Sequence, residues 1–546
     1  MVMKGMILRI MALVLLGWFV ISVDLAAQKL SGLWRDFDCV RQSEAWLTSS
    51  NASGLIRLPD SIPSVSLAEV YANKDNGGFV NYYQSDNSFT FGAQTESYYR
   101  LNKKVVLYGK VDYKNFTGQD MGGSAFINPD YNAFDIVEVS ASTKGEKGLE
   151  QYDLIGAAGV SLSPRFSIGG KLDYQTANYA KHKDLRHKNN YLDMTATAGA
   201  NYRLSNAIEI GANYIYRRSV EGIEFGVYGN TDQMYSPLID FGAFYGRTEL
   251  FSTTGYGYTY STGGGKTPVF NQFQGGALQV NWKIERDWSF FNEFFYQARN
   301  GRYGTGASSN IIFDKNDGTV MDYSGTLSLM KKQNQYFLKL NINDDQLTNR
   351  ENVYTINTPQ AGKTQIIYYG ANKVLDRTQL TGGLEFTGQL AVKDYCPKWI
   401  LKAGANYSDR QQTVVLYPYF RKQDISWWDS YLYADRRFTS KKQQFDVSLQ
   451  VAYGTGGGNA KTDGLYATPS ADTRQPASSD YNLYREYEYL TADRVAGNIG
   501  CGYSRIINSS LRAYVRLEYA LTKAFQITYL DGSQFGSAKI TIGCNF

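Results

Sequence analysis

The chain has 546 residues with a formal net charge of +5, and it contains 44 Tyr, 53 Gly and only 11 Pro. A charge this small for the length, without a strongly basic block, argues against nucleic acid as a partner. Tyrosine favours strands and membrane interfaces, and glycine supplies tight turns. We therefore expect one repetitive β-architecture rather than several soluble domains.

The amino-terminal residues have the pattern of a secretory signal peptide. Lys4 and Arg9 precede an apolar run over residues 10–23, and Ala26 and Ala27 supply small residues at a cleavage site. We predict a signal peptide over residues 1–27, and thus an exported protein. No later run of 18 or more apolar residues occurs, so we expect no transmembrane helix in the mature chain.

Residues 28–76 show no sustained alternation. The segment contains Pro59 and Pro63, which interrupt regular structure, together with Trp34 and Trp46. We predict an N-terminal segment that either plugs the lumen of a barrel or lies in the periplasm. A poorly ordered leader before the first strand is an alternative.

From residue 77 onward, apolar and polar residues alternate with the period of two that is typical of a half-buried strand. One such segment carries Leu192 and Met194 on one face, and Asp193 and Thr195 on the other. The pattern indicates transmembrane strands with one face toward lipid and the other toward water. The residues expected to line the lumen carry both signs of charge and include Lys110, Asp112, Lys171, Asp173, Asp193, Arg203, Glu209, Arg217, Lys402, Asp446, Arg512, Arg516 and Glu518.

The connections between these segments fall into two size classes. Short turns are predicted near Asn102, Pro164, Ser205, Arg286, Gln333, Asp394, Ser440 and Asn508. Longer loops, including 346–374 and 413–423, lie between these turns. Strict alternation of short and long connections is typical of outer-membrane barrels, which keep their short turns in the periplasm. We therefore predict an all-β fold, a transmembrane antiparallel up-and-down β-barrel over residues 77–546. The best count is 18 strands, within a range of 14–18, if residues 77–84 form a short first strand.

The final stretch, residues 536–546, reads as the closing strand of the barrel. Ala538, Ile540, Ile542 and Phe546 fall on one face of the strand. A terminal aromatic strand resembles the signal by which outer-membrane barrels are recognised for insertion, so Phe546 is a candidate for membrane assembly. We expect this strand to pair with the first strand.

The two histidines, His182 and His187, lie in a basic stretch that is predicted to be an outer loop. Their spacing fits neither a helix face nor a strand face, and the neighbouring cations repel a metal ion, so we expect no metal site and no cofactor. The interpretations that remain are a solvated or loop-packing role and contact with the phosphates of lipopolysaccharide.

No recognisable catalytic motif occurs, and we expect that the protein is not an enzyme. Outer-membrane hydrolases need a base close to a nucleophile, or paired carboxylates. Asp130, Asp135 and Asp184 lie in predicted loops, and nothing in the sequence indicates that any two of them converge. A hydrolase is therefore kept only as a remote alternative.

With these features in place, the chain resembles an uncharacterised family of outer-membrane β-barrel proteins from Bacteroidota. The resemblance rests mainly on D-M-G-G-S-A-F-I-N-P-D-Y at residues 120–131 and on A-K-H-K-D-L-R-H at residues 180–187. It implies a Gram-negative outer membrane and an association with other envelope transport components, but no substrate. The first candidates for functional loop residues are Asp120, Asn128, Asp130, Asp184, Arg186 and His187.

A wide barrel with a charged lumen favours a transport-related function, either as a channel or as a subunit of an envelope uptake or export complex. A non-conducting scaffold or surface-binding barrel is the alternative. The expected location is the outer membrane of a Gram-negative cell. The expected partners are outer-membrane lipid and lipopolysaccharide, the assembly machinery for barrel insertion, and other outer-membrane transport proteins or lipoproteins.

Overall fold

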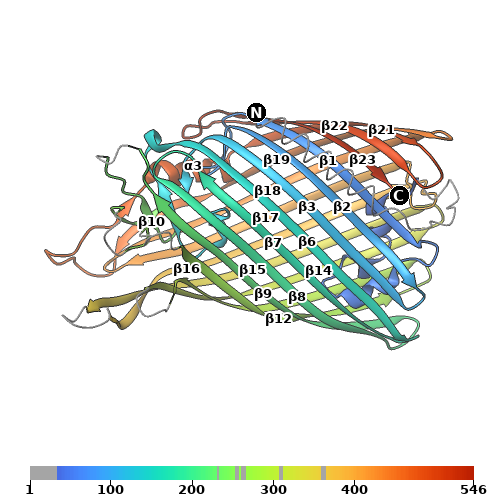
Figure 1. The fold of residues 1–546 in the computed structure, drawn as a ribbon, viewed down its shortest axis with the longest axis horizontal. Helices are drawn as coiled ribbons and strands as arrows, with labels where there is room; N and C mark the ends of the chain where they lie inside the picture. The colour runs from blue at the N-terminus through green and yellow to red at the C-terminus, as the bar shows by residue number, and fades with distance from the viewer. Residues whose placement is uncertain (1–33, 230–232, 252–256, 260–265, 306–310, 358–364) are drawn as a thin grey trace.

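The structure, a computed structural model, describes residues 34–229, 233–251, 257–259, 266–305, 311–357 and 365–546. Eighteen antiparallel strands form one sheet that closes on itself as a barrel (Figure 1). Each strand pairs with the barrel strands before and after it in sequence, and the last pairs with the first. The 18-stranded antiparallel barrel is therefore confirmed, whereas the predicted signal peptide, residues 1–27, lies outside the described residues.

The barrel strands differ in length from 12 to 26 residues. They are β1 (Ser64–Asn76), β2 (Asn87–Asn102), β3 (Val105–Met121), β6 (Gly145–Ser163), β7 (Phe166–Lys181), β8 (Arg186–Arg203), β9 (Ile208–Gly226), β12 (Thr267–Lys283), β13 (Trp288–Gly304), β14 (Ile312–Lys331), β15 (Asn334–Asn357), β16 (Gln365–Leu390), β17 (Trp399–Leu416), β18 (Tyr419–Thr439), β19 (Gln443–Leu465), β21 (Arg494–Ile506), β22 (Arg512–Ala524) and β23 (Gln534–Asn545).

Alternation along the strands separates an apolar outer face from a polar lumen. On β23, Ile540 and Ile542 are 40% and 53% exposed on the outer face, whereas Thr541 between them is buried on the lumen side. Directly paired residues point to the same side of a sheet, so neighbouring apolar positions join into one lipid-facing band. The lipid-compatible outer face that the sequence predicts is thus present.

The barrel closes between β1 and β23, where Val70 is paired with Ile542 and Leu67 with Asn545. The first strand therefore occupies residues 64–76, and residues 77–84, which the sequence predicts as that strand, form a connection instead. The barrel begins at Ser64 rather than at residue 77. The alternation of β1 is weak because Leu67, on its lumen side, packs against the N-terminal segment.

All eight predicted short turns join consecutive barrel strands at one end of the barrel, which we call the short-turn end. At the opposite end, the long-loop end, strands extend into several predicted loops, and two of these show it most clearly. Residues 413–423 are mostly strand, because β17 and β18 are joined by Tyr417 and Pro418 alone. Residues 346–357 and 365–374 likewise continue β15 and β16 as a long hairpin (Figure 1). Consecutive polar residues at 348–352 and consecutive apolar residues at 414–416 both interrupt the alternation, while backbone pairing still forms the strands.

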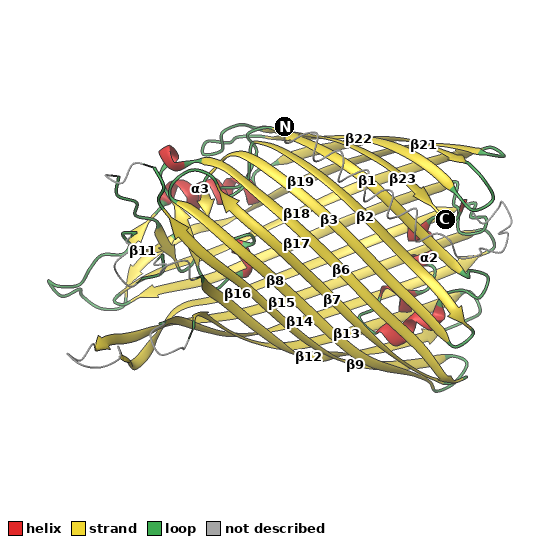
Figure 2. Cartoon of the chain, viewed as in Figure 1, coloured by secondary structure: helices red, strands yellow, loops and turns green. Residues whose placement is uncertain are grey.

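Two further bodies lie inside the barrel (Figure 2). Near the short-turn end, the N-terminal segment forms α2 (Phe37–Gln42), η2 (Ala45–Thr48) and η3 (Ala52–Arg57). Near the long-loop end, three loops contribute a second sheet, which we call the loop sheet; its strands are β4 (Gly123–Ser124), β5 (Asp135–Glu138), β10 (Leu238–Asp240), β11 (Tyr245–Thr248) and β20 (Ala477–Ser478). The short helices η4 (Pro129–Tyr131) and η5 (Ala141–Thr143) and the helix α3 (Asp480–Thr491) belong to the same loops. In the part of the chain that the structure describes, no helix is both long and apolar enough to cross a bilayer.

Candidate functional site

The N-terminal segment is held in the lumen by an apolar contact with the wall. Val40, Leu55 and Ile62 of the segment form one buried cluster with Tyr98 of β2 and Val106 of β3. These two wall residues point into the lumen, where polar side chains predominate. The wall therefore carries a local apolar patch where the segment lies against it.

Glycines on the lumen face make room for the backbone of η3. A Cβ atom at Gly169 would lie 2.3 Å from the Ser53 nitrogen and 2.4 Å from the Ala52 carbonyl carbon. A Cβ atom at Gly199 would lie 2.4 Å from Asn51 Oδ1. Any side chain at Gly169 or Gly199 would therefore clash with the N-terminal segment. The glycines allow the wall and the segment to pack this closely.

Polar contacts fix the segment on the same side of the barrel. The Asn51 side-chain amide donates hydrogen bonds to the backbone oxygens of Ala200 and Ala212, at 3.0 and 3.2 Å. The Ser50 amide donates to the Glu293 carboxylate at 3.1 Å, and Arg57 forms an ion pair with Glu209. These partners come from β8, β9 and β13, so one short segment bridges several wall strands.

An aromatic contact explains a segment that is aromatic on both faces. On β13, Phe290, Phe294 and Tyr296 face outward, whereas Phe291 is only 5% exposed and points inward. The Phe291 ring meets Trp46 of η2 edge-on, with ring centroids 5.2 Å apart. The inward aromatic residue is thus a contact with the N-terminal segment, which the period of two does not reveal.

Asp36 anchors the beginning of α2 to the far wall. Its side chain caps the helix by accepting a hydrogen bond from the Cys39 amide at 2.9 Å, and it pairs with Arg437 of β18 at 2.8 Å. Burial alone would raise the pKa of Asp36, but Arg437 and the Cys39 amide outweigh it and lower the pKa to about 2. Asp36 is therefore ionised under all ordinary conditions.

Beside α2, the lumen retains a cavity of about 650 Å³. Its wall consists of strands β16 to β19 and β21 to β23, together with β1 and α2 itself. Six carboxylates line it against four cations, and these are Asp36, Asp38, Glu69, Glu385, Asp435, Asp446, Lys402, Arg437, Arg512 and Arg516. A cavity of this size and polarity accommodates small hydrated solutes rather than apolar ligands.

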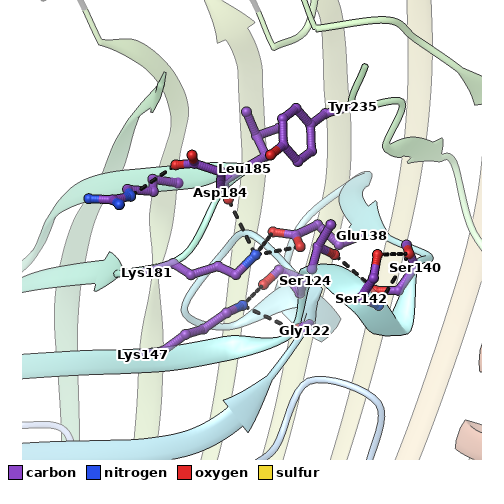
Figure 3. Close-up of polar contacts among 12 residues, drawn as sticks. Gly122, Ser124, Glu138, Ser140, Ser142, Lys147, Lys181, Asp184, Leu185 and Tyr235 are labelled. Carbon is purple, nitrogen blue, oxygen red and sulfur yellow. Dashed lines mark hydrogen bonds and ion pairs between the residues drawn. The ribbon is translucent and has the colours of Figure 1, made fainter. Parts of the chain in front are cut away.

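At the long-loop end, two fully buried lysines tie the loop of residues 122–144 to the wall (Figure 3). Lys181 of β7 pairs with Glu138 of β5, with Nζ 2.6 Å from Oε1. Lys147 of β6 donates to the backbone oxygens of Gly122 and Ser124, at 2.9 and 2.7 Å. Buried charges are tolerated where they are paired and hydrogen-bonded, so these contacts fix the position of the loop.

Three of the predicted site residues, Asp184, Arg186 and His187, lie next to this loop. Asp184 is buried; it accepts a hydrogen bond from the Gly229 amide at 2.7 Å and pairs with Arg186 at 2.9 Å. His187 is fully buried, and its Nδ1 lies 2.9 Å from Asn189 Oδ1. Asn189 in turn donates to the Ala125 backbone oxygen at 2.8 Å. The two stretches that carry the family resemblance therefore meet in space, as loop-packing elements.

The other three predicted residues do not join this group. Asp120 is exposed at the end of β3, with a left-handed φ of 50°. Asn128 is exposed before η4, and its side chain makes no capping hydrogen bond. Asp130 accepts a hydrogen bond from the Tyr83 hydroxyl at 3.2 Å and lines a small cavity that Arg377 and Arg410 also border.

Sequence reasoning named Asp135 only as a loop carboxylate and missed its pairing with a second buried carboxylate, Asp240, in the loop sheet. Asp135 of β5 and Asp240 of β10 are directly paired in register, and each is less than 10% exposed. Burial raises the pKa of Asp135 to about 6 and that of Asp240 to about 7. A signal was present in the sequence, because the apolar pairs Ile136-Val137 and Leu238-Ile239 are unusual in loops that face only water.

The chain matches the model of DUF6850, a family of unknown function, over residues 56–546. It belongs to this family. The match spans all 18 barrel strands and the end of the N-terminal segment. An uncharacterised family is thereby confirmed, and no curated protein matches the sequence.

Solved structures of bacterial receptors resemble the fold weakly. The ferric preacinetobactin receptor BauA of Acinetobacter baumannii has a TM-score of 0.40 at 7% identity, covering 89% of this chain and 80% of that one. A variant of the ferric enterobactin receptor PfeA of Pseudomonas aeruginosa has a TM-score of 0.40 at 8% identity, covering 88% and 81%. The ferric-catecholate import receptor Fiu of Escherichia coli K12 has a TM-score of 0.37 at 7% identity, covering 88% and 81%. No ligand of this chain follows from scores this low.

Proposed function

We propose that the protein is a gated, transport-related barrel of a Gram-negative outer membrane, and that this structure is its closed state. The single observation that carries the proposal is the 650 Å³ polar cavity beside the N-terminal segment. A barrel that served only as a scaffold would need no polar cavity between the N-terminal segment and the wall. We infer further that the host is a member of the Bacteroidota, on the sequence resemblance alone.

The contacts of the N-terminal segment suit a part that moves. Arg41 pairs with Glu96, Arg57 with Glu209, and Asp36 with Arg437, all at the border of a hydrated lumen. Water replaces such ion pairs when the groups become solvated, so the main cost of displacing the segment is the exposure of its apolar contact with Tyr98 and Val106. Displacement of the segment would join the cavity to the remainder of the lumen.

The proposal is tested by moving the segment without altering its own sequence. Gly169→Ala places a methyl group within 2.3 Å of the η3 backbone, whereas Gly170→Ala on the outer face meets nothing nearer than the Thr197 oxygen at 3.7 Å. Planar-bilayer conductance of both variants is compared with that of the wild type. We expect Gly169→Ala to raise the conductance, and Gly170→Ala to leave it at the low wild-type level.

Thiol labelling reports whether the segment has moved. Cys39 in α2 is 2% exposed, so it reacts slowly with a maleimide until the segment is displaced. Faster labelling of Cys39 together with unchanged conductance would contradict the transport function. That outcome would support the second candidate, a non-conducting scaffold, which is favoured by the fact that inserted segments occupy the lumen near both ends.

Neither candidate assigns chemistry to the loop residues. His187 is fully buried and Asp184 is engaged by backbone amides, so a hydrolytic role is not proposed for them. Partners remain proposals as well, namely the barrel assembly machinery and other outer-membrane transport proteins or lipoproteins. Native co-purification of the intact protein tests for them.

A further inference from the structure

Four cations stand directly opposite one another across four neighbouring strands. Arg302 of β13 is paired with Lys315 of β14, Lys315 with Arg350 of β15, and Arg350 with Lys373 of β16. Because neighbouring strands are about 4.8 Å apart, this cation row spans about 15 Å. Like charges directly opposite each other destabilise a sheet, so the row costs free energy unless an anion lies against it.

The side chains of the cation row point away from the lumen. Their neighbours along the strands, Tyr303, Asp314 and Asn349, are fully buried on the inward side. Arg302, Lys315 and Lys373 are exposed, and Arg350 is half-buried. The row therefore belongs to the outer surface and plays no part in the lumen described above.

Neighbouring carboxylates neutralise the charge of only two of the four cations in the row. Arg350 pairs with Asp317, and Lys373 pairs with Asp376 at 2.7 Å. Over the described ranges, no carboxylate lies within ion-pair distance of Arg302 or Lys315. Arg302 instead lies over the Phe270 ring at 4.9 Å, and Arg218 of β9 lies over the same ring at 5.1 Å. Arg218 extends the positive surface toward β9 without a carboxylate partner of its own among the residues described.

The height of the row matches the headgroups of a bilayer. On the outer face of β13, Phe294 and Tyr296 are 49% and 42% exposed, and Ala298 is the last apolar residue before Arg302. Four residues of a strand tilted by about 40° rise about 10 Å along the barrel axis. Arginine and lysine side chains span several ångströms more, so they reach groups just above the lipid-facing band.

The row of directly paired cations lies on one side of the barrel. On β17 and β18, at the same end, the outer face carries Asp409, Asp424 and Lys422, and Lys422 is paired with Thr413 and Thr462 rather than with another cation. A bilayer surrounds the barrel on all sides, so a general attraction to anionic lipid would favour cations all round. A one-sided row indicates a discrete site.

We propose that the cation row, with Arg218, binds the phosphate groups of an anionic, phosphorylated glycolipid of the outer leaflet. Guanidinium and ammonium groups pair with phosphate through strong, charge-assisted hydrogen bonds. Arg302 and Lys315 lack carboxylate partners in the described part of the chain and lie on neighbouring strands. Two cations this close together suit a phosphorylated group that carries more than one negative charge. The phosphates of the bound lipid would take the place of the carboxylates that Arg302 and Lys315 lack.

The test compares two double variants of the full-length protein in neutral detergent. Arg302→Gln with Lys315→Gln removes the uncompensated half of the row. Lys441→Gln with Lys442→Gln removes the same charge from an exposed turn at the short-turn end. Binding of diphosphorylated lipid A is measured by native mass spectrometry. Each cation near an anionic lipid surface contributes about fivefold, so we expect about 30-fold weaker binding for the first variant and no change for the second.

Equal losses in the two variants, or no loss in either, would overturn the proposal. Two further arms distinguish a lipid from a free anion: dephosphorylated lipid A is expected not to bind, and inorganic phosphate at the same concentration is expected not to displace lipid A. Displacement by inorganic phosphate would show a plain anion site and overturn the lipid assignment. If the double variant does not migrate as a folded barrel, lipid A binding of the single variant Lys315→Gln is compared with that of the wild type. We then expect about fivefold weaker binding.

Discussion

Ser66 and Phe546 exchange two backbone hydrogen bonds, with each nitrogen 3.0 to 3.1 Å from the other residue's oxygen. They extend the pairing of β1 with β23 beyond its last register pair, Leu67 with Asn545. The seam between β1 and β23 therefore extends as far as Ser66 and Phe546.

Deletion of Phe546 should weaken barrel assembly. It removes two backbone hydrogen bonds, worth about 1 kcal/mol each, from the seam between β1 and β23 that closes the barrel. The measurement is the outer-membrane level of the shortened protein and its heat-modifiable migration on a gel. Phe546→Leu keeps both hydrogen bonds and serves as the control. A loss in both variants would assign the effect to the aromatic side chain, and unchanged levels for the deletion would contradict a role of Phe546 in assembly.

The sequence predicted the barrel well wherever one face of a strand meets lipid and the other meets water. It failed at β1 because the lumen face there also carries apolar residues, Leu67 and Tyr71, and because Ser66, Ala68 and Ala72 make a weak outer face. Leu67 contacts the N-terminal segment, and the alternation along a single strand does not report such a tertiary contact. Such a strand loses its period of two for a tertiary reason.

The loop sheet could not be predicted for a different reason. Its strands are two to four residues long and come from three separate loops, so no local pattern identifies their pairing. The same limit applies to the candidate site. The sequence selected Asp184 and His187 as loop residues, but they pack against a loop that is held by contacts between distant positions, such as Lys181 with Glu138, which are 43 positions apart in the chain. The distinctive residues were found, whereas their role in packing was not.

Lys181→Met should loosen the loop of residues 122–144. The substitution leaves the Glu138 carboxylate buried without its partner, and breaking a buried pair in this way costs about 3–5 kcal/mol. Limited proteolysis of the intact protein is expected to cut within this loop in the variant and not in the wild type. A protease-resistant loop in Lys181→Met would contradict the anchoring role.

Two variants act as controls for this prediction. Lys181→Met combined with Glu138→Gln removes both charges and should restore most of the protection. Lys171→Met breaks the pair with Asp173, whose groups are 3.6 Å apart and about one third exposed, so it should cost less than about 1 kcal/mol.

Acid should release the N-terminal segment. The pKa of Asp36 is lowered to about 2, so its ionised form stabilises docking above the ordinary aspartate pKa of about 3.9. That contribution is lost as the pH falls from about 4 through 2, because the carboxyl becomes protonated and the pair with Arg437 is broken. Maleimide labelling of Cys39 after a brief acid pulse should increase over this range. Asp36→Asn removes the charge at every pH, so a wild-type-like acid response in that variant would assign the transition to other carboxylates.

The loop sheet should respond to pH in the opposite direction. Asp135 and Asp240 face each other in register, and Tyr82, Lys147 and Glu486 are the nearby titratable groups. Because their pKa values are raised to about 6 and about 7, the folded sheet favours the protonated carboxyls. The stability of the sheet is therefore greatest below about pH 4 and falls as the pH rises toward 7, by at most about 1.4 kcal/mol per pH unit for each group.

Hydrogen exchange at the amides of the paired residues Ile136 and Ile239 measures this effect. After correction for intrinsic rates, protection at pH 5 should exceed that at pH 8. In Asp240→Asn the side-chain oxygen still accepts hydrogen bonds from the Gly242 and Tyr245 amides, at 2.8 and 3.0 Å in the wild type, but the charge is gone. The difference between pH 5 and pH 8 should therefore shrink, whereas Asp472→Asn on an exposed turn should leave it unchanged. Greater protection at pH 8 than at pH 5 in the wild type would mean that the two carboxylates are stabilised as anions, contrary to their burial opposite each other.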